Sequence, residues 1–322
     1  MNRRRPVQAS YQVQSAVPAL RQGGVIGLIA PAGPAALDPL KAQQWVQARG
    51  YELRIFPGVS QRDGYLAGDD EVRLRDLHDA FADPEIDVIL CLRGGYGCPR
   101  LLDDIDFELL KKHPKPLVGY SDITALHLAI ARYAGFMTFH GPLFNADLLG
   151  DKLPPTESSL FNLLSGQVRA GSCFEHPAAF PLTTVVPGAA SGRLQGGNLS
   201  LICATLGTPY EIDTRGVILL IEDVNEPLYR VDRLLTHLRL AGKLEGLNGV
   251  LVGDFAGVDA DALARLLRQE LGALGIPVLA GWRSGHCDPN LTLPLGAQVR
   301  LDADARQLVL EQDVTILLTA DC

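Results

Sequence analysis

The sequence has no run of about 18 uninterrupted apolar residues, the length that a membrane-spanning helix needs. Its start, MNRRRPVQASYQVQSAVPALRQGG, carries a positive cluster but no continuous apolar core. A secretory signal is therefore a poor fit. These absences lead us to expect a soluble, cytoplasmic protein with no membrane partner.

An excess of positive charge is also lacking. Lysine and arginine number 29 against 37 aspartates and glutamates, a net charge of −8, so we expect no nucleic-acid partner. The six cysteines are scattered without a CxxC pair, and no His/Cys/Asp cluster has zinc or iron spacing. The sequence therefore predicts reduced thiols, no metal and no cofactor.

The 322 residues, 47% hydrophobic and 20% charged, suffice for two cores. The first half alternates apolar strand-like runs with helical segments, for example at 72–84 and 101–114, which is typical of a parallel sheet with helices on both faces. After about residue 145 the chain is irregular, and shorter strand-like runs then follow with one good helix at 227–242. We therefore expect an α/β protein with a flexible extension (1–20), an N-terminal domain (21–150), an interdomain linker (151–190) and a C-terminal β-rich α/β domain (191–322).

Three predicted strands of the first half end in the loops PAGP (31–34), RGGYG (93–97) and GYSD (119–122). Sites in such sheets form beyond the carboxyl ends of the strands. In the third loop Ser121 lies between a strand and a helix, where its hydroxyl would project above the sheet and helical N–H groups would favour an oxyanion. The pattern is similar to a G-x-S-x-G nucleophile elbow, with Ile123 in place of the second glycine. The alternative is that Ser121 or Asp122 only caps the helix.

A nucleophilic serine needs a base, and the base needs an acceptor that orients it. His286 lies in a loop after an apolar strand, a position suited to a general base. Glu222 ends another very apolar strand, where a carboxylate needs a partner. That partner is either the Nδ1–H of His286 or a structural arginine, Arg230 or Arg233.

The RGGYG loop offers a second set of candidates. Gly94, Gly95 and Gly97 allow a close backbone approach to a ligand and offer N–H donors, but they match no nucleotide-binding motif. Cys98 is a rival nucleophile, or else a small buried thiol. His140 follows a strand-like run and could line a site.

Nine stretches, in order from about residue 25 to 300, carry a family resemblance: GLIAPAGP, YLAGDDEVRLRDLHDAF, CLRGGYGCPRLLDDIDF, KPLVGYSDITALHL, TFHGPL, LQGGNLSLICATLGTPY, ILLIEDVNEPLYRVDRLLTHLRLAG, GVLVGDF and GHCDPNLTLPLG. Together they resemble the LD-carboxypeptidase family, which includes the microcin C immunity peptidases. The chain departs from the family in its longer N-terminal extension and in small residues of the first loop, Ala32, Ala35 and Ala36.

The resemblance implies a triad of Ser121, Glu222 and His286, with the backbone N–H groups of Asp122 and Gly95 as oxyanion donors. It also implies an N-terminal domain similar to class I glutamine amidotransferases, a homodimer, and a murein tetrapeptide as substrate. The bond cleaved would join the L-centre of diaminopimelate or lysine to the terminal D-alanine, which fits cytoplasmic peptidoglycan recycling.

A carboxypeptidase also needs a cation for the terminal carboxylate of its substrate. Arg93 and Arg233 are the candidates, although each could be structural. A microcin-type immunity peptidase would be favoured by an aromatic in a mobile loop, and 145–190 has three phenylalanines but no tryptophan. A non-catalytic peptidoglycan-fragment binder would not need all three triad residues, and a glutamine amidotransferase would need cysteine at the elbow.

Overall fold

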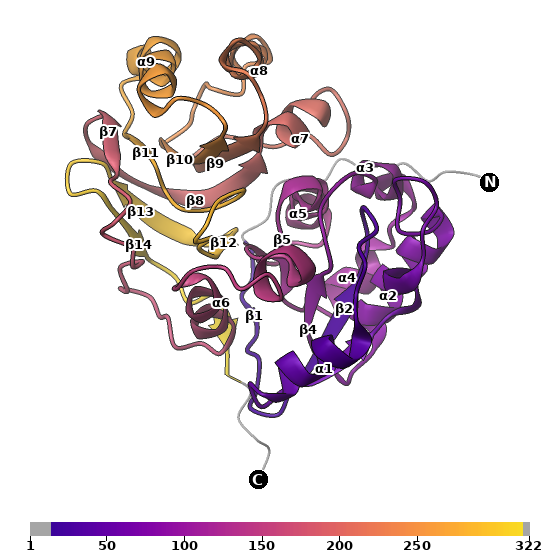
Figure 1. Ribbon diagram of the computed structural model, residues 1–322. Coiled ribbons are helices and arrows are strands. Elements are labelled where there is room, and N and C mark those ends of the chain that lie inside the picture. The colour runs from indigo at the N-terminus through magenta and orange to yellow at the C-terminus, as the bar shows by residue number, and fades with distance from the viewer. Residues whose placement is uncertain (1–13, 318–322) are drawn as a thin grey trace.

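The computed structural model describes residues 14–317, which build two large β-sheets, one largely from each half of the chain, and a third sheet of two short strands (Figure 1). The apolar core of the first sheet continues into the second, because Leu220, Leu251 and Leu279 of the second sheet pack into the same cluster as Leu126 and Phe139. The two sheets therefore face one another across buried apolar side chains, which fixes their relative position.

The first sheet has six strands in the order β12-β6-β5-β4-β2-β3. Its five N-terminal strands are parallel, and β12 adds an antiparallel edge from the other half of the chain. The parallel strands are short apolar runs, as expected for strands that are covered on both faces. The bounds are β2 (Val25–Ile29), β3 (Glu52–Ile55), β4 (Ile86–Cys91), β5 (Leu117–Gly119), β6 (Thr138–His140) and β12 (Leu293–Leu295).

The helices of this half largely follow the predictions, with one correction. The expected single helix at 101–114 is wrong: a short helix ends at Leu101, and a new one begins at Phe107. The break arises because the Asp106 carboxylate accepts the N–H of Leu109 at 3.0 Å and so caps the second helix. The bounds are α1 (Pro39–Gln47), α2 (Asp70–Ala82), α3 (Cys98–Leu101), α4 (Phe107–Lys112) and α5 (Thr124–Tyr133).

Helix α5 lies between the two sheets and joins them. Its residues 124–131 are all buried, as expected for a helix that is apolar on nearly every side. It contacts β6 on one side and β8 on the other. The Thr124 hydroxyl accepts the N–H of Asn198 at 3.0 Å, so a polar contact also ties the start of α5 to the second sheet.

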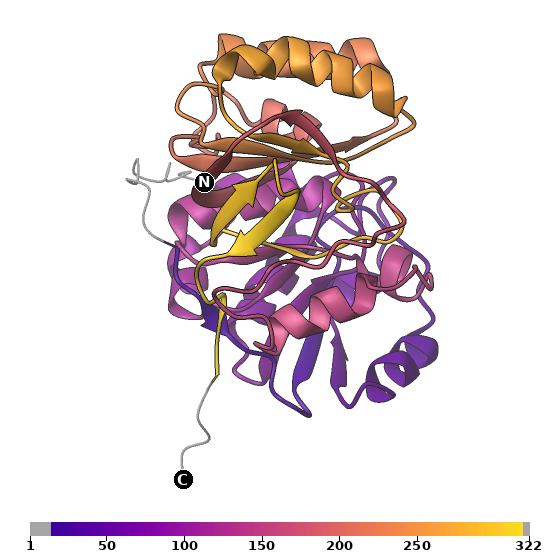
Figure 2. The same ribbon diagram turned by 90° about the vertical axis from the view of Figure 1, so that its left-hand side faces the viewer.

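The second sheet has seven strands in the order β14-β13-β8-β9-β10-β11-β7, with β8 to β11 parallel. Helices α7, α8 and α9 cover the face that points away from the first sheet (Figure 2). Only one good helix is expected here, yet α9 also forms, because leucines recur along it at helical spacing. The bounds are β8 (Ala189–Asn198), α7 (Leu199–Ala204), β9 (Val217–Val224), α8 (Leu228–Leu240), β10 (Gly249–Ala256), α9 (Ala260–Leu271), β11 (Val278–Ala280), β13 (Gln298–Asp302) and β14 (Gln307–Leu310).

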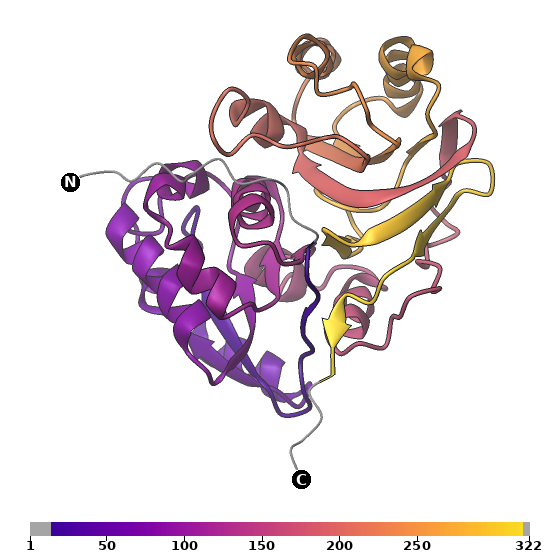
Figure 3. The same cartoon turned by 180° about the vertical axis from the view of Figure 1, so that it is seen from behind.

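The expected linker, 151–190, holds helix α6 (Thr156–Leu164) and strand β7 (Thr183–Val186), so it is not irregular throughout. Of the expected flexible extension, residues 1–13 lie outside the described residues. The rest is not a free tail, because β1 (Val17–Pro18) pairs in parallel with β15 (Thr315–Ile316), side by side in Figure 3. No helix within residues 14–317 is long and apolar enough to cross a membrane.

Candidate active site

The loops that follow β2, β4 and β5 meet at one edge of the first sheet, as the parallel topology predicts. The N–H of Gly33 donates to the carbonyl of Gly94 at 3.0 Å and joins the first two loops. A Cβ added to Gly94 would lie 2.8 Å from the Cβ of Ser121, so the second loop passes directly over the serine. Gly95 follows with a φ of +116°, a conformation that side chains rarely adopt. Only glycines allow this close approach.

Ser121 has a strained backbone. Its φ is +64°, in the left-handed region that non-glycine residues seldom occupy, and its side chain is half-buried at the start of the 3₁₀ turn η3 (Ser121–Ile123). Neither Ser121 nor Asp122 caps a helix with its side chain. The Asp122 carboxylate instead accepts the N–H of Cys98 at 2.7 Å. The capping alternative is therefore wrong, and the strain is of the kind that nucleophile elbows show.

Two residues lie beneath these loops and hold them in place. Cys98 is fully buried, with its sulfur 3.7 Å from the carbonyl of Pro31, and burial raises the pKa of its thiol well above the usual range. It is therefore unsuited to be a nucleophile. The buried guanidinium of Arg73 donates to the same carbonyl at 2.6 Å. No pattern in the sequence indicates this role, because Arg73 lies in an ordinary amphipathic helix.

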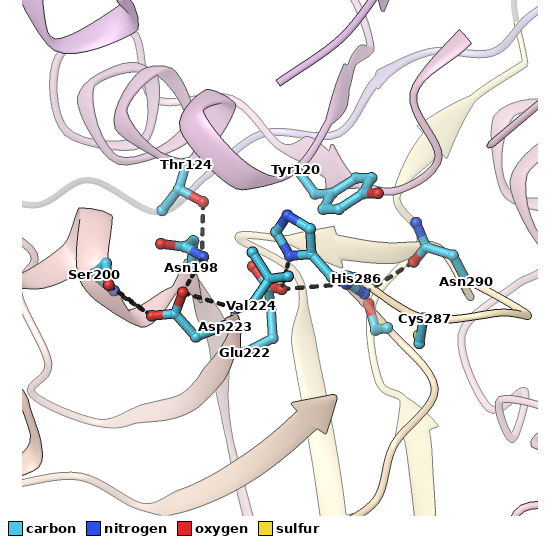
Figure 4. Close-up of polar contacts among 12 residues, drawn as sticks. Tyr120, Thr124, Asn198, Ser200, Glu222, Asp223, Val224, His286, Cys287 and Asn290 are labelled. Carbon is cyan, nitrogen blue, oxygen red and sulfur yellow. Dashed lines mark hydrogen bonds and ion pairs between the residues drawn. The ribbon is translucent and has the colours of Figure 1, made fainter. Parts of the chain in front are cut away.

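Alternation along β9 separates its two terminal carboxylates. Ile218 and Leu220 point toward the first sheet, and Glu222 continues that face with no solvent exposure. Asp223 points the other way and accepts the N–H and the hydroxyl of Ser200 at 2.9 and 2.8 Å, at the start of α7 (Figure 4). Asp223 is therefore structural, and Glu222 alone faces the loops of the first sheet.

Glu222 is paired with His286. The Nδ1 of His286 lies 2.7 Å from Oε2 of Glu222, and the backbone N–H of His286 donates to the same oxygen at 3.3 Å (Figure 4). The structural alternative for Glu222 is wrong, because Arg230 pairs with Glu226 at 3.5 Å and Arg233 makes no described contact with Glu222. The imidazole of His286 is oriented by a carboxylate, as a general base requires.

The charge state of Glu222 follows from its surroundings. Burial acts to raise the pKa of Glu222, but interactions with His140 and His286 outweigh burial and lower that pKa to about 2. The carboxylate is therefore ionised throughout the range in which histidine titrates. It can hold the Nδ1–H of His286 and balance the charge of an imidazolium.

Tyr120 and a segment near residue 150 hold the other side of His286. The Tyr120 ring meets the imidazole edge-on, with centroids 4.8 Å apart, and its hydroxyl lies 3.4 Å from Asp147. Lys152 donates to the carbonyl of Cys287 at 2.6 Å and pairs with Asp147 at 3.2 Å. No sequence pattern links these residues to the histidine loop, so they could not be found before the fold was known.

The two arginines predicted for a substrate carboxylate lie in different places. Arg93 is exposed beside Gly94, on the loop that covers Ser121, and donates to the carbonyl of Pro34 at 2.9 Å. Arg233 lies exposed on α8, over the ring of Tyr229 at 5.6 Å. Its described contacts do not reach the triad candidates. Among residues 14–317, no group of three or more His, Cys, Asp and Glu side chains is arranged to hold a metal.

Gly285 is the tightest point of the site and gives a first prediction. Its φ is +104°, and a Cβ there would lie 2.4 Å from Oε2 of Glu222. Gly285→Ala should therefore displace the Glu222–His286 pair and lower kcat by roughly 10²-fold, the effect expected of a shift of about 1 Å at a catalytic group.

The matched control is Gly171→Ala, at a φ of +90° with nothing within 4 Å of the added Cβ. Both variants should lose stability from backbone strain, measured by thermal unfolding. Only Gly285→Ala should lose activity. Equal activity in the two variants would show that catalysis does not depend on the position of the Glu222 carboxylate.

A strained serine at a strand exit, preceded by a tyrosine whose ring meets a carboxylate-bound imidazole, is typical of the serine hydrolases when it occurs on an α/β scaffold. Two family models then match the chain: the LD-carboxypeptidase N-terminal domain over residues 26–141 and the LD-carboxypeptidase C-terminal domain over residues 191–301. The chain belongs to the LD-carboxypeptidase family.

Relatives share sequence along most of the chain. A Bacillus subtilis protein named "probable murein peptide carboxypeptidase" is 40% identical over 92% of this chain and 94% of its own length. The murein tetrapeptide carboxypeptidase of Pseudomonas aeruginosa is 34% identical over 87% of this chain and 94% of its own.

Solved structures show the same mixed α/β fold. The muramoyltetrapeptide carboxypeptidase from Oxalobacter formigenes is 31% identical, with a TM-score of 0.75 over 92% of this chain and 100% of its own. The protein MccF in complex with glutamyl sulfamoyl guanosine is 25% identical, with a TM-score of 0.84 over 93% of this chain and 99% of its own.

Proposed function

We propose that the protein is a serine-type LD-carboxypeptidase that releases the terminal D-alanine of murein tetrapeptides by hydrolysing an L,D-amide bond. The observation that carries the proposal is the Glu222–His286 pair, 2.7 Å apart, with a fully buried carboxylate. The imidazole of this pair meets the ring of Tyr120, the residue that precedes the strained Ser121. The murein substrate is supported by the names of the relatives in B. subtilis and P. aeruginosa.

The proposed chemistry is acyl transfer through a covalent serine ester. His286, oriented by Glu222, removes the proton of the Ser121 hydroxyl, and the alkoxide attacks the carbonyl carbon of the L,D-amide. The backbone N–H groups of Asp122 and Gly95 stabilise the oxyanion. His286 then protonates the departing D-alanine amine, and a water activated by the same histidine releases the tripeptide.

Arg93 is the proposed partner of the terminal carboxylate, because it lies on the loop that passes over Ser121. A guanidinium is well suited to a carboxylate, which it can bind through two parallel hydrogen bonds. Arg233 is the second candidate, on α8. We also propose that the protein forms a homodimer and acts in peptidoglycan recycling. Its first half is proposed to be similar to class I glutamine amidotransferases.

A second candidate function, cleavage of aminoacyl-nucleotide conjugates, is favoured by the fold similarity to MccF bound to glutamyl sulfamoyl guanosine. Two of the three phenylalanines of 145–190 give it less support. Phe161 stacks on Tyr51 with centroids 5.4 Å apart, and Phe180 lies under the guanidinium of Arg283 at 4.5 Å. Both rings are engaged within the chain, so neither is presented to a nucleobase.

The test is to incubate the purified protein with murein tetrapeptide and measure free D-alanine by chromatography, with the conjugate glutamyl sulfamoyl guanosine in a parallel reaction. We expect D-alanine from the tetrapeptide and no cleavage of the conjugate. Cleavage of the conjugate alone would move the assignment to the immunity peptidases. Binding of the tetrapeptide without cleavage would favour a peptidoglycan-fragment binder.

A further inference from the structure

A second histidine, His140, faces the catalytic carboxylate from the first sheet. It is the last residue of β6 and lies opposite Gly119 of β5, two residues before Ser121. Its side chain has no solvent exposure. The same sheet edge that presents the serine thus also presents this imidazole toward the second sheet.

Unmet hydrogen-bonding groups point to what His140 does. Its Nε2 lies 3.9 Å from Oε1 of Glu222, the oxygen that His286 does not use. Both atoms are buried, and neither has a hydrogen-bond partner among the described residues. A buried carboxylate oxygen without a partner is costly, and a shift of about 1 Å would bring this pair to hydrogen-bond distance.

The contact of the other ring nitrogen is compatible with a hydrogen bond from His140 to Glu222. Nδ1 of His140 lies 3.2 Å from the hydroxyl of Ser284, which is fully buried. When this hydroxyl donates to Nδ1, the neutral imidazole carries its proton on Nε2, directed at Oε1 of Glu222. Each oxygen of Glu222 then faces one imidazole N–H, from His286 on one side and His140 on the other.

We propose that His140 is a positioning residue, which holds the free oxygen of Glu222 so that the other oxygen keeps the His286 imidazole in its catalytic orientation. The inference rests on the proposed function for its kinetic readout only. Its physical consequence is that both halves of the chain are needed to assemble the triad. The first half supplies Ser121 and also His140, which holds the carboxylate of Glu222 from the second half.

Two substitutions separate this role from simple packing. His140→Gln keeps an N–H donor near the position of Nε2, whereas His140→Leu fills similar space without a donor. We expect His140→Leu to lower kcat on murein tetrapeptide by about 10- to 100-fold with KM nearly unchanged, the loss expected for a hydrogen bond to a charged group. His140→Gln should recover most of that loss. Equal impairment of the two variants, or wild-type kcat in His140→Leu, would overturn the proposal.

The positioning role of His140 can also be tested without substrate, and therefore independently of the proposed function. The Nδ1–H of His286, shared with Glu222, should give a low-field proton resonance in the NMR spectrum of the wild-type protein. The resonance should persist in His140→Gln and shift or broaden in His140→Leu. His127→Leu, which removes another buried histidine from the first half, is the matched control and should leave the resonance in place. A resonance unchanged in all variants would refute the positioning role even if the substrate proves to be another one.

Discussion

Replacing Ser121 with alanine is expected to abolish D-alanine release, with a fall in kcat of about 10³- to 10⁶-fold. In the proposed mechanism the alanine removes the hydroxyl oxygen that forms the acyl-enzyme, while the proposed oxyanion donors and substrate contacts remain. The measurement is single-turnover release of D-alanine from murein tetrapeptide. Ser165→Ala, at the half-buried end of α6 away from the three loops, is the control and should keep wild-type rates.

The strain at Ser121 adds a second readout to the same substitution. Because its φ is +64°, glycine should fit this position better than alanine. Ser121→Gly is therefore expected to be inactive but more stable to unfolding than Ser121→Ala, by about 1 kcal/mol. D-alanine release that survives either substitution would rule out Ser121 as the nucleophile.

Glu222→Gln is expected to lower kcat by about 10⁴-fold. The amide can donate a hydrogen bond to Nδ1 of His286, which would place the imidazole proton on Nε2, the nitrogen that must accept the proton of the serine. The neutral amide also no longer balances the charge of the imidazolium. The measurement is kcat on murein tetrapeptide at saturating concentration, with folding checked by thermal unfolding.

The neighbouring carboxylate provides a matched control. Asp223→Asn weakens the bonds to Ser200 at the start of α7, on the opposite face of the same strand. This variant should lose stability, because hydrogen bonds to charged groups contribute about 1.5–3 kcal/mol to folding. Its kcat should stay within about tenfold of the wild type. A larger loss of activity in Asp223→Asn than in Glu222→Gln would mean that the wrong carboxylate has been assigned.

Much of the fold of the first half could be predicted from local sequence patterns. The strands β2, β4 and β5 were predictable because a parallel strand covered on both faces needs a short, continuous apolar run, which each of them has. Their order in the sheet was not needed to see that their loops would meet at one edge. Ser121 could therefore be singled out from its place between a strand and a helix.

Local pattern failed where a contact or a partner decided the outcome. One helix was expected at 101–114, but the capping contact of Asp106 divides it. The segment 151–190 reads as irregular, yet β7 forms there because β11 supplies an antiparallel partner. Strand β12 likewise exists through its pairing with β6 of the other half. A strand's hydrogen bonds depend on its neighbour, which a short stretch of sequence does not name.

The sequence by itself determined the kind of residues available for catalysis, their positions at the ends of apolar elements and the family to which the chain belongs. The tertiary structure decided which of them meet. Glu222 and His286 are 64 positions apart, and His140 and Ser284 are 144 apart, yet each pair is in contact. Such contacts arise from the burial of apolar surface between the two sheets, a non-directional force summed over many side chains. No single motif encodes it, so the partners of the buried carboxylate became visible only in the folded chain.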